Sequence, residues 1–475
     1  MYKNSRSVFY CSFMVLLFSI SYGQNIHFVA NSDSPEATAC NNSHKIALKS
    51  GEGTNDTINV VFQSSDSVYI AVTTNCGYTW STPVAFGQGR SPAIDVNLFG
   101  FRHVAWQSLD NEIYYDCLDD WAPPVNVSQS AGLSTLPDLV ADSSGVIHVV
   151  WVEQIGGYNH IYYRTAIGGG VSSDTVRISG YGSPEATYDH PSISIFHPGY
   201  RLYALWECYD LQCYSPYQIH LRHKEGTLWD TTRVWSHYLP MRHPSIDYAH
   251  GQIYDTLSFC YEDSTSGNLE ATFYGGNGGG YQTQGNSTYP VVSTVGSTWS
   301  YLFWQEDSAG SNDIYFDLYY FSSGWTQGSL NYPESIRYPS VCGAYVVWTQ
   351  GDSDPYSIYL ADFGYPIGID GAAQEQLFVL TAFPNPFSER TTLTMAGPTM
   401  QTETRLNIYD SSGRLVTVLV AESVTSAPLM AQKDQRCTFI WDGLDATGKK
   451  VSAGIYWGCP ANNHDYPTLK VIKVN

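Results

Sequence analysis

Three arginines recur at one fixed place in this 475-residue sequence, two residues before a proline. They are Arg90 before Pro92, Arg242 before Pro244 and Arg337 before Pro339. A guanidinium binds a carboxylate through paired hydrogen bonds, so arginines gathered at one site would suit an anionic ligand such as an acidic sugar. We therefore treat the three as candidate ligand-binding residues.

A second set of polar and aromatic side chains recurs at fixed positions in the same pattern. Histidine or tyrosine directly precedes four of the recurring prolines, at His190, His243, Tyr289 and Tyr338. Glutamate follows a recurring aromatic residue by one or two positions, at Glu153, Glu207, Glu262 and Glu306. Glu207 and Glu262 are a candidate carboxylate pair, as a glycosidase requires. The alternative is that the arginines and acids pair with one another on the surface, where such pairs contribute little stability.

The remaining motifs point to no further chemistry. The sequence has no serine nucleophile elbow, phosphate-binding loop or zinc motif, so we predict no catalytic residue, metal site or cofactor. A histidine recurs on predicted second strands, at His103 and His148, where a packed and hydrogen-bonded role is expected.

These residues belong to a repeat that returns seven times. Each unit has a short apolar strand that often begins at proline, a second strand that ends in an aromatic residue, and a third strand of the Ile-Tyr-Tyr kind. The second strands are expected to end at Phe62, Trp106, Trp151, Trp206, Tyr261, Trp304 and Trp348. Strand repeats of about 40–50 residues predict an all-β fold, a β-propeller of seven blades with six or eight as the margin. Residues 26–30 would supply the last blade's fourth strand and close the ring.

The propeller geometry is what would bring the candidate residues together. Innermost strands start, and second strands end, on the same face of the disc. The residues before the prolines and after the aromatic positions should therefore converge around the central mouth.

The ends of the chain predict export. Residues 1–23 contain a basic start (Lys3, Arg6), an apolar run over 8–20 and small residues at Ser21 and Gly23, which is the pattern of a signal peptide. We expect no membrane-spanning segment after its removal. A net charge of −21 argues against a nucleic-acid partner, because such binding depends on Lys and Arg. Nine cysteines remain after cleavage, and Cys208–Cys213 and Cys437–Cys459 are the first disulfides to expect.

The pattern changes after residue 363. Residues 364–376 are expected to be a linker, and residues 377–475 an immunoglobulin-like β-sandwich of seven short strands with Asp-Gly and Gly-Lys turns.

One local motif resembles that of a known family. Thr73-Thr-Asn75-Cys-Gly77-Tyr-Thr79-Trp80 resembles the Asp box of sialidase-like (BNR-repeat) propellers, with Asn75 where the family has Asp. In that family the box is structural. The Phe/Tyr-Arg-Ile-Pro motif that carries the first arginine of a sialidase is missing, and Phe101-Arg102 does not replace it.

The tail resembles the type A C-terminal sorting domain of type IX secretion, which is related to flagellar hook-capping proteins. The resemblance rests on Phe383-Pro384-Asn385-Pro386-Phe387, Leu406 to Asp410, Trp441-Asp442-Gly443 and Ala453 to Tyr456, in that order. It implies recognition by the secretion machinery at the outer membrane of a Gram-negative bacterium, and a secreted or surface-held protein.

Three functions follow as hypotheses. The first is an exported, non-catalytic module that binds a glycan or a surface protein at the mouth. The second is a divergent sialidase-like glycoside hydrolase that acts on an anionic sugar. The third is a structural or adhesive surface protein that uses the propeller as a scaffold.

Overall fold

The computed structural model describes residues 25–40, 43–49, 57–97, 100–120, 122–142, 144–167, 170–180, 182–196, 201–226, 228–237, 240–249, 256–263, 268–274, 280–282, 287–295, 299–308, 311–320, 324–330, 334–363, 379–383, 387–397, 405–410, 414–421, 423–429, 432–460 and 469–474. Its elements are all β-strands, as the sequence predicts. The expected signal peptide and the linker at 364–376 lie outside these residues. Among them, no helical segment is long and apolar enough to cross a bilayer.

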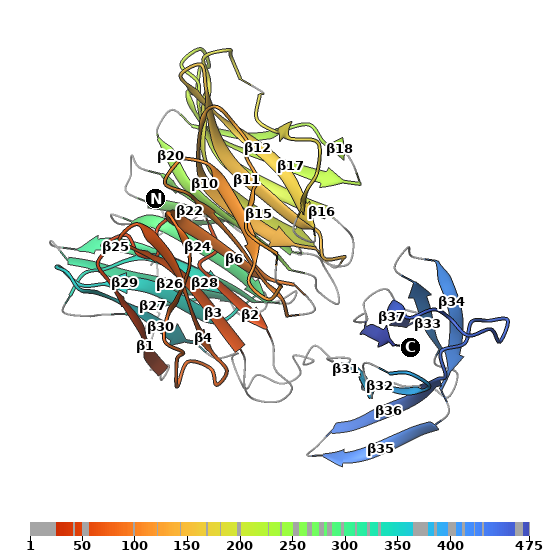
Figure 1. Ribbon diagram of the computed structural model, residues 1–475. Helices are drawn as coiled ribbons and strands as arrows, with labels where there is room; N and C mark the ends of the chain where they lie inside the picture. The colour runs from red at the N-terminus through yellow and green to blue at the C-terminus, as the bar shows by residue number, and fades with distance from the viewer. Residues whose placement is uncertain are drawn as a thin grey trace, which may run out of the picture.

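The first 30 strands form seven antiparallel sheets, the blades of a β-propeller (Figure 1). The innermost strands are β2 (Ile46–Lys49), β6 (Arg90–Val96), β10 (Leu133–Ala141), β15 (Thr187–Phe196), β20 (Met241–Ala249), β24 (Ser287–Val295) and β28 (Ile336–Cys342). The second strands are β3 (Thr57–Ser64), β7 (Arg102–Gln107), β11 (Ile147–Ile155), β16 (Arg201–Tyr209), β21 (Thr256–Asp263), β25 (Trp299–Ser308) and β29 (Tyr345–Gln350).

The outer strands complete each blade. The third strands are β4 (Ser67–Thr73), β8 (Ile113–Cys117), β12 (Tyr158–Ile167), β17 (Tyr217–Glu225), β22 (Asn268–Tyr274), β26 (Ser311–Tyr320) and β30 (Tyr356–Asp362). The outermost are β5 (Val84–Gln88), β9 (Val125–Asn126), β13 (Gly170–Val171) with β14 (Val176–Arg177), β18 (Leu228–Trp229) with β19 (Arg233–His237), β23 (Gly280–Gln282) and β27 (Gly324–Leu330).

The ring closes as predicted, because the N-terminal strand completes the last blade. Strand β1 (Asn25–Ser32) pairs antiparallel with β30, the third strand of the seventh blade. Figure 1 shows the two strands side by side although they are the first and the last strand of the propeller. Each innermost strand contacts the next, and β28 contacts β2. Closure removes the free sheet edge that an open array would expose.

The recurring aromatic residues form the packing between strands. Each lies near the end of its second strand. In five blades this residue stacks on an aromatic residue directly opposite on the third strand, whereas Trp206 is tilted against His220 and Tyr261 lies opposite Glu270. Examples are Trp106 on Tyr114, Trp151 on Tyr162 and Trp304 on Tyr315, with ring centroids 5.9, 6.0 and 6.1 Å apart. Such cross-strand pairs add about 0.5–1.5 kcal/mol each beyond the area they bury. In these five blades the repeat in the sequence is therefore a repeat of one stacked pair.

The innermost strands differ from the prediction in where they begin. They were expected to open at proline, but Pro92, Pro244 and Pro339 lie inside β6, β20 and β28. At each proline the pairing register with the second strand shifts, which marks a β-bulge. A bulge accommodates proline within a sheet because its missing N–H is not needed there.

The Asp-box-like segment forms the turn that its residue types predict. The Asn75 side chain accepts a hydrogen bond from the Thr79 amide (2.9 Å) and donates to the Thr79 hydroxyl (2.9 Å). Gly77 has φ +93°, a conformation that glycine adopts without strain. The turn follows a third strand, so in this antiparallel order it lies at the opposite end of the blade from the start of the innermost strand.

The C-terminal residues form a sandwich of two four-stranded sheets, in the orders β31-β32-β36-β35 and β34-β33-β37-β38. Its strands are β31 (Val379–Phe383), β32 (Thr391–Gly397), β33 (Arg405–Asp410), β34 (Leu415–Val420), β35 (Ser423–Leu429), β36 (Gln432–Trp441), β37 (Gly454–Pro460) and β38 (Leu469–Lys473). This is one strand more than the sequence suggests. A single core that includes Phe387, Leu406, Phe439 and Trp441 holds the two sheets together.

In the described part of the chain neither expected disulfide is formed. Cys208 is buried in the core of its blade, whereas the thiol of Cys213 donates to Asp210 (3.3 Å). Cys437 points into the sandwich core. Cys459 is half-buried and alternates with the buried Tyr456 and Gly458, so its side chain is on the outer face of the other sheet. In each expected pair the two cysteine side chains point in different directions, and the spacing of cysteines in the sequence does not show this.

Candidate binding site at the mouth of the ring

The mouth is built from a backbone conformation that six blades share. The residue before each recurring proline has positive φ: 51° at Ser91 and Leu136, 48° at His190, 49° at His243, 51° at Tyr289 and 55° at Tyr338. Non-glycine residues rarely adopt this region, and the residue before proline usually adopts extended backbone. The bulge therefore fixes the direction of one extra side chain at the same point of each blade.

In the fourth to seventh blades these bulged residues are rings that touch in sequence. The ring centroids are 4.8 Å apart for His190 and His243, 4.5 Å for His243 and Tyr289, and 4.9 Å for Tyr289 and Tyr338. All four are half-buried. We call these four residues the mouth cluster. The structure thus brings together four of the residues that sequence analysis singled out.

Two glutamates support the histidines of the mouth cluster. His190 Nδ1 lies 2.5 Å from Glu207 Oε1, and His243 Nδ1 lies 2.9 Å from Glu262 Oε2. The backbone N–H of His243 also donates to Glu207 Oε2 (3.3 Å), which links the two blades. Burial opposes charge on His190, but the charge of Glu207 outweighs it and raises the pKa of His190 well above its ordinary value. Burial likewise opposes the charge of Glu207, yet His190 lowers the pKa of that carboxyl.

The other two glutamates of the same sequence pattern have a different role. Glu153 and Glu306 follow their tryptophan by two residues, and strand alternation places them on the same side as its ring. The indole N–H of Trp151 donates to Glu153 (3.0 Å), and that of Trp304 donates to Glu306 (3.0 Å). Glu207 and Glu262 follow their aromatic residue by one position, so they are on the other side of the strand and meet the histidines.

Among the described residues, the side-chain contacts of the three arginines are those of Arg337, and they lie within its own blade. Arg337 Nη2 donates to the Gly351 carbonyl (2.8 Å), and its guanidinium lies 6.0 Å from the ring centre of Tyr356 on the third strand of the same blade. Arg90 and Arg242 are exposed, and neither has a side-chain hydrogen bond or ion pair to another described residue. Each arginine precedes the bulge, whereas the mouth-cluster residue lies in it. The two side chains therefore point in different directions.

Sequence analysis missed the contribution of Thr38, Cys40 and Lys45. Thr38 Oγ1 donates to the Tyr338 carbonyl (2.8 Å), and Cys40 helps to raise the pKa of His190. Lys45 is fully buried, with its ammonium on Ser43 Oγ (3.0 Å), and burial lowers its pKa to about 8. The register pairs Ile46 with Val60 as it pairs Ile94 with Val104, so Lys45 takes the place of the residue directly after proline, which is Ala93 in the second blade.

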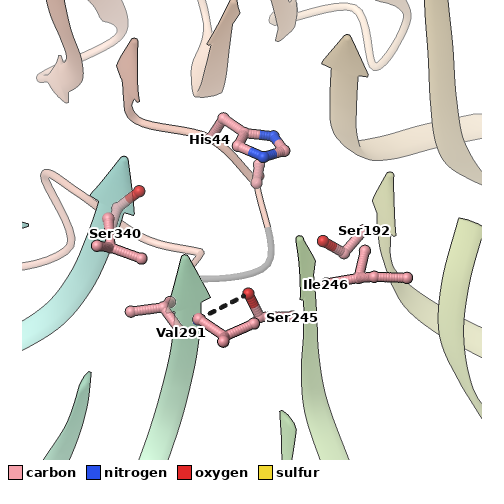
Figure 2. Close-up of a pocket in the computed structure, with 9 residues that line it drawn as sticks. His44, Ser192, Ser245, Ile246, Val291 and Ser340 are labelled. Atoms are coloured by element: carbon pink, nitrogen blue, oxygen red, sulfur yellow. Dashed lines mark hydrogen bonds between the residues drawn. The ribbon is translucent and has the colours of Figure 1, made fainter. Parts of the chain in front are cut away.

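A small cavity of about 10 Å³ lies on the ring axis next to the mouth cluster. Figure 2 shows His44 on one side and Ser192, Ser245, Val291 and Ser340 on the innermost strands around it. Four of these follow a cluster residue by two positions. The volume suffices for about one water molecule. A sugar would therefore have to bind on the mouth cluster and not within the axis.

A larger space lies elsewhere, between the outer strands of the first two blades. It has a volume of about 580 Å³, and its lining includes Val72, Phe86, Arg102, Leu118 and Asp120. None of the predicted site residues lines it.

No family model matches the sequence, and no curated protein matches it. Solved structures with a similar course of the chain include the polysaccharide lyase Uly1 (8% identity, 71% of this chain and 98% of that chain, TM-score 0.45). Another is a GH43 endo-arabinanase from Bacillus licheniformis (11% identity, 69% of this chain and 96% of that chain, TM-score 0.31). A third is a xylan β-1,4-xylosidase from Bacillus halodurans C-125 (12% identity, 93% of this chain and 92% of that chain, TM-score 0.34). At such identities the activities in these names belong to those proteins alone.

Proposed function

We propose that this protein is an exported β-propeller that binds a glycan at the mouth cluster without cleaving it. The observation that carries the proposal is the unbroken contact of His190, His243, Tyr289 and Tyr338 across four blades. Aromatic rings offer apolar faces to the C–H side of a sugar, and their polar tips hydrogen-bond hydroxyl groups. The rings are held by backbone bulges and by buried acids, so little ordering is required on binding.

The charges around the mouth favour a neutral sugar. Glu207 and Glu262 lie directly beside the cluster, and Arg337 is turned over its own blade. Asp95, Asp138 and Asp247 lie close to His44 near the axis. A carboxylated sugar would meet these acids, and Arg337, engaged within its own blade, would not balance its charge. We therefore favour a hydroxyl-rich, uncharged glycan over the anionic ligand that the arginine pattern suggests.

A glycoside hydrolase is the second candidate, and one observation favours it. His243 bridges the two carboxylates of the proposed acid pair, with its Nδ1 on Glu262 and its backbone N–H on Glu207. Glycosidic cleavage requires a pair of carboxyl groups, and these two lie on adjacent blades. Each is engaged with a histidine, however, and this engagement is why binding without cleavage is the first proposal.

Delivery to the cell surface forms part of the proposal. Residues 1–23 would direct export, and residues 377–475 would be recognised by a type IX secretion system and then be released or hold the propeller at the surface. The Phe387 backbone pairs with Ile472 and Val474, so this last residue of the Phe383–Phe387 motif is built into the sandwich. Deletion of residues 377–475 should leave the propeller inside the cell envelope, as fractionation of the producing bacterium would show.

The binding test uses purified protein without residues 1–23 on an array of neutral and acidic glycans. We expect retention of neutral glycans and a loss of about tenfold, or ~1.4 kcal/mol, in the variants His243→Ala and Tyr289→Ala. Tyr78→Ala is the matched control, because Tyr78 is an exposed aromatic residue in the turn at the opposite end of a blade. Equal binding by all variants would refute the site. Release of product from aryl-glycosides would support the hydrolase, and capture of a cell-surface protein without glycan retention would support a purely adhesive role.

A further inference from the structure

The fourth blade carries a group of metal-type ligands at the edge of the mouth cluster. One donor atom from each of Asp189, His190 and Glu207 lies within 4.8 Å of the others. We propose that these three side chains bind a divalent transition-metal cation such as Zn²⁺. The site shares His190 with the mouth cluster but needs neither Tyr289 nor Tyr338.

The distances between the donor atoms are suitable for a bound cation. His190 Nδ1 lies 2.5 Å from Glu207 Oε1 and 3.7 Å from Asp189 Oδ1. Two ligands of a tetrahedral cation, each about 2.0–2.2 Å from the metal, lie roughly 3.4 Å apart, which falls between these distances. Small rotations of the side chains suffice, with the cation in place of the hydrogen between Nδ1 and Oε1. That hydrogen leaves as a proton to solvent.

The carboxylates are held so that one oxygen of each remains for the cation. Asn159 Nδ2 donates to Asp189 Oδ2 (3.3 Å), and the His243 backbone N–H donates to Glu207 Oε2 (3.3 Å). The oxygens that face His190 are Glu207 Oε1 and Asp189 Oδ1; the latter also accepts the His190 backbone N–H (2.9 Å), and its second lone pair is left for the cation. Groups that orient the ligands in this way are typical of metal sites. The side chains of His190, Asp189 and Glu207 are 20, 35 and 16% exposed, so the point is enclosed but open to an ion from solution.

The acid at position 189 is what sets this blade apart. The residue two positions before proline is Arg90, Arg242 and Arg337 in three blades and Thr135 and Thr288 in two others, whereas the fourth blade has Asp189. The fifth blade repeats the histidine–glutamate pair as His243 and Glu262 but has Arg242 in place of the second acid. A cation is therefore expected in the fourth blade and not in the fifth.

The donor set selects the kind of metal. One imidazole nitrogen and two carboxylate oxygens suit Zn²⁺ and its first-row neighbours, whereas Ca²⁺ prefers six to eight oxygen ligands. Three protein ligands leave at least one coordination position open.

The test is titration calorimetry of ZnCl₂ into tag-free full chain without residues 1–23, previously stripped with a chelator, and metal analysis after dialysis. We expect one tight Zn²⁺ per chain in the parent protein and at least tenfold weaker binding in Asp189→Asn and in His190→Gln. Glu306→Gln is the control, because this acid is on the corresponding second strand but serves Trp304. Circular dichroism verifies that each variant is folded.

The outcomes separate clearly. A parent protein without stoichiometric Zn²⁺ would overturn the proposal, and so would folded Asp189→Asn and His190→Gln variants that bind as tightly as the parent. Glycan binding is measured on the same samples, so failure of the metal site and failure of the glycan site are seen independently.

Discussion

His44 and Asp138 join the first blade to the third across the ring, with His44 Nδ1 2.8 Å from Asp138 Oδ1. The His44 backbone N–H donates to the same carboxylate oxygen (3.1 Å), and Asp138 Oδ2 accepts the Ile193 amide (3.0 Å) from the fourth blade. Both residues belong to the innermost layer of the ring, His44 just before β2 and Asp138 within β10. One carboxylate thus connects three blades.

This pair predicts a pH dependence of stability. Burial opposes charge on His44, but Asp138, with Asp95 and Asp247, raises its pKa to about 9 from an ordinary 6.5. A raised histidine pKa contributes stability that is fully present below about pH 6.5 and is lost as the pH rises through 9. A shift of this size corresponds to about 3 kcal/mol at most. Urea unfolding at pH 6 and pH 9.5 should show the free-energy difference between the parent and His44→Gln shrinking at the higher pH. An equal difference at both values would contradict the charge pair.

The bulged positions predict a dependence on side-chain shape at Ser91. Its φ of 51° is hard for a β-branched residue, so Ser91→Val should lower the free energy of unfolding by about 1–3 kcal/mol. Ser91→Gly should change it by less than about 1 kcal/mol, because relief of strain offsets the greater freedom of the unfolded chain. Thermal unfolding of the two variants measures this contrast. If valine proved as well tolerated as glycine, the positive φ would be wrong.

Glu153 should matter for stability and not for binding. It accepts hydrogen bonds from Trp151 Nε1 (3.0 Å), from Ser134 (2.6 Å) and from Ser130, and it is buried. Glu153→Ala leaves these donors without an acceptor and should cost about 2–4 kcal/mol of unfolding free energy. Glycan affinity of the folded variant should stay within twofold of the parent. A Glu153→Ala protein with parental stability but weakened glycan binding would place this acid in the site instead.

Ring closure predicts unequal effects along β1. Ala30 is 4% exposed between the first and last blades, and Phe28 on the same strand is 49% exposed. Ala30→Asp buries an unpaired charge and should destabilise the propeller by at least about 3 kcal/mol. Phe28→Asp should cost about 1 kcal/mol or less. Chemical unfolding of both variants provides the comparison. Similar losses in the two would mean that β1 is not the closing strand.

The fold was predictable because it repeats a local pattern. The Trp–Tyr pairs, the proline of six innermost strands and the segment 26–30 appear in the sequence in the order in which the blades form. Apart from the closing strand β1, each blade is an antiparallel sheet of consecutive strands. The closing strand was found because the last unit lacked a fourth strand of its own, and pairing of the two chain ends is a physical requirement of a closed ring.

The site was predictable only in part, because side-chain direction depends on single-residue offsets. The four rings of the mouth cluster came together as expected. Arg337 did not join them, since the bulge between Arg337 and Ser340 turns neighbouring residues to different sides. Asp189 and Lys45 were missed because their partners are seen only in the folded chain: Asp189 lies with Glu207 of its own blade, and Lys45 is buried beside Ser43.

The central claim is that the mouth cluster is where this protein meets its ligand. A crystal structure of the protein with an oligosaccharide selected on the array tests it most directly. We predict sugar density against the rings of His243 and Tyr289, with a hydroxyl in hydrogen-bond reach of a histidine. Density in the space lined by Phe86 and Arg102 between the first two blades, with a bare mouth cluster, would contradict the account.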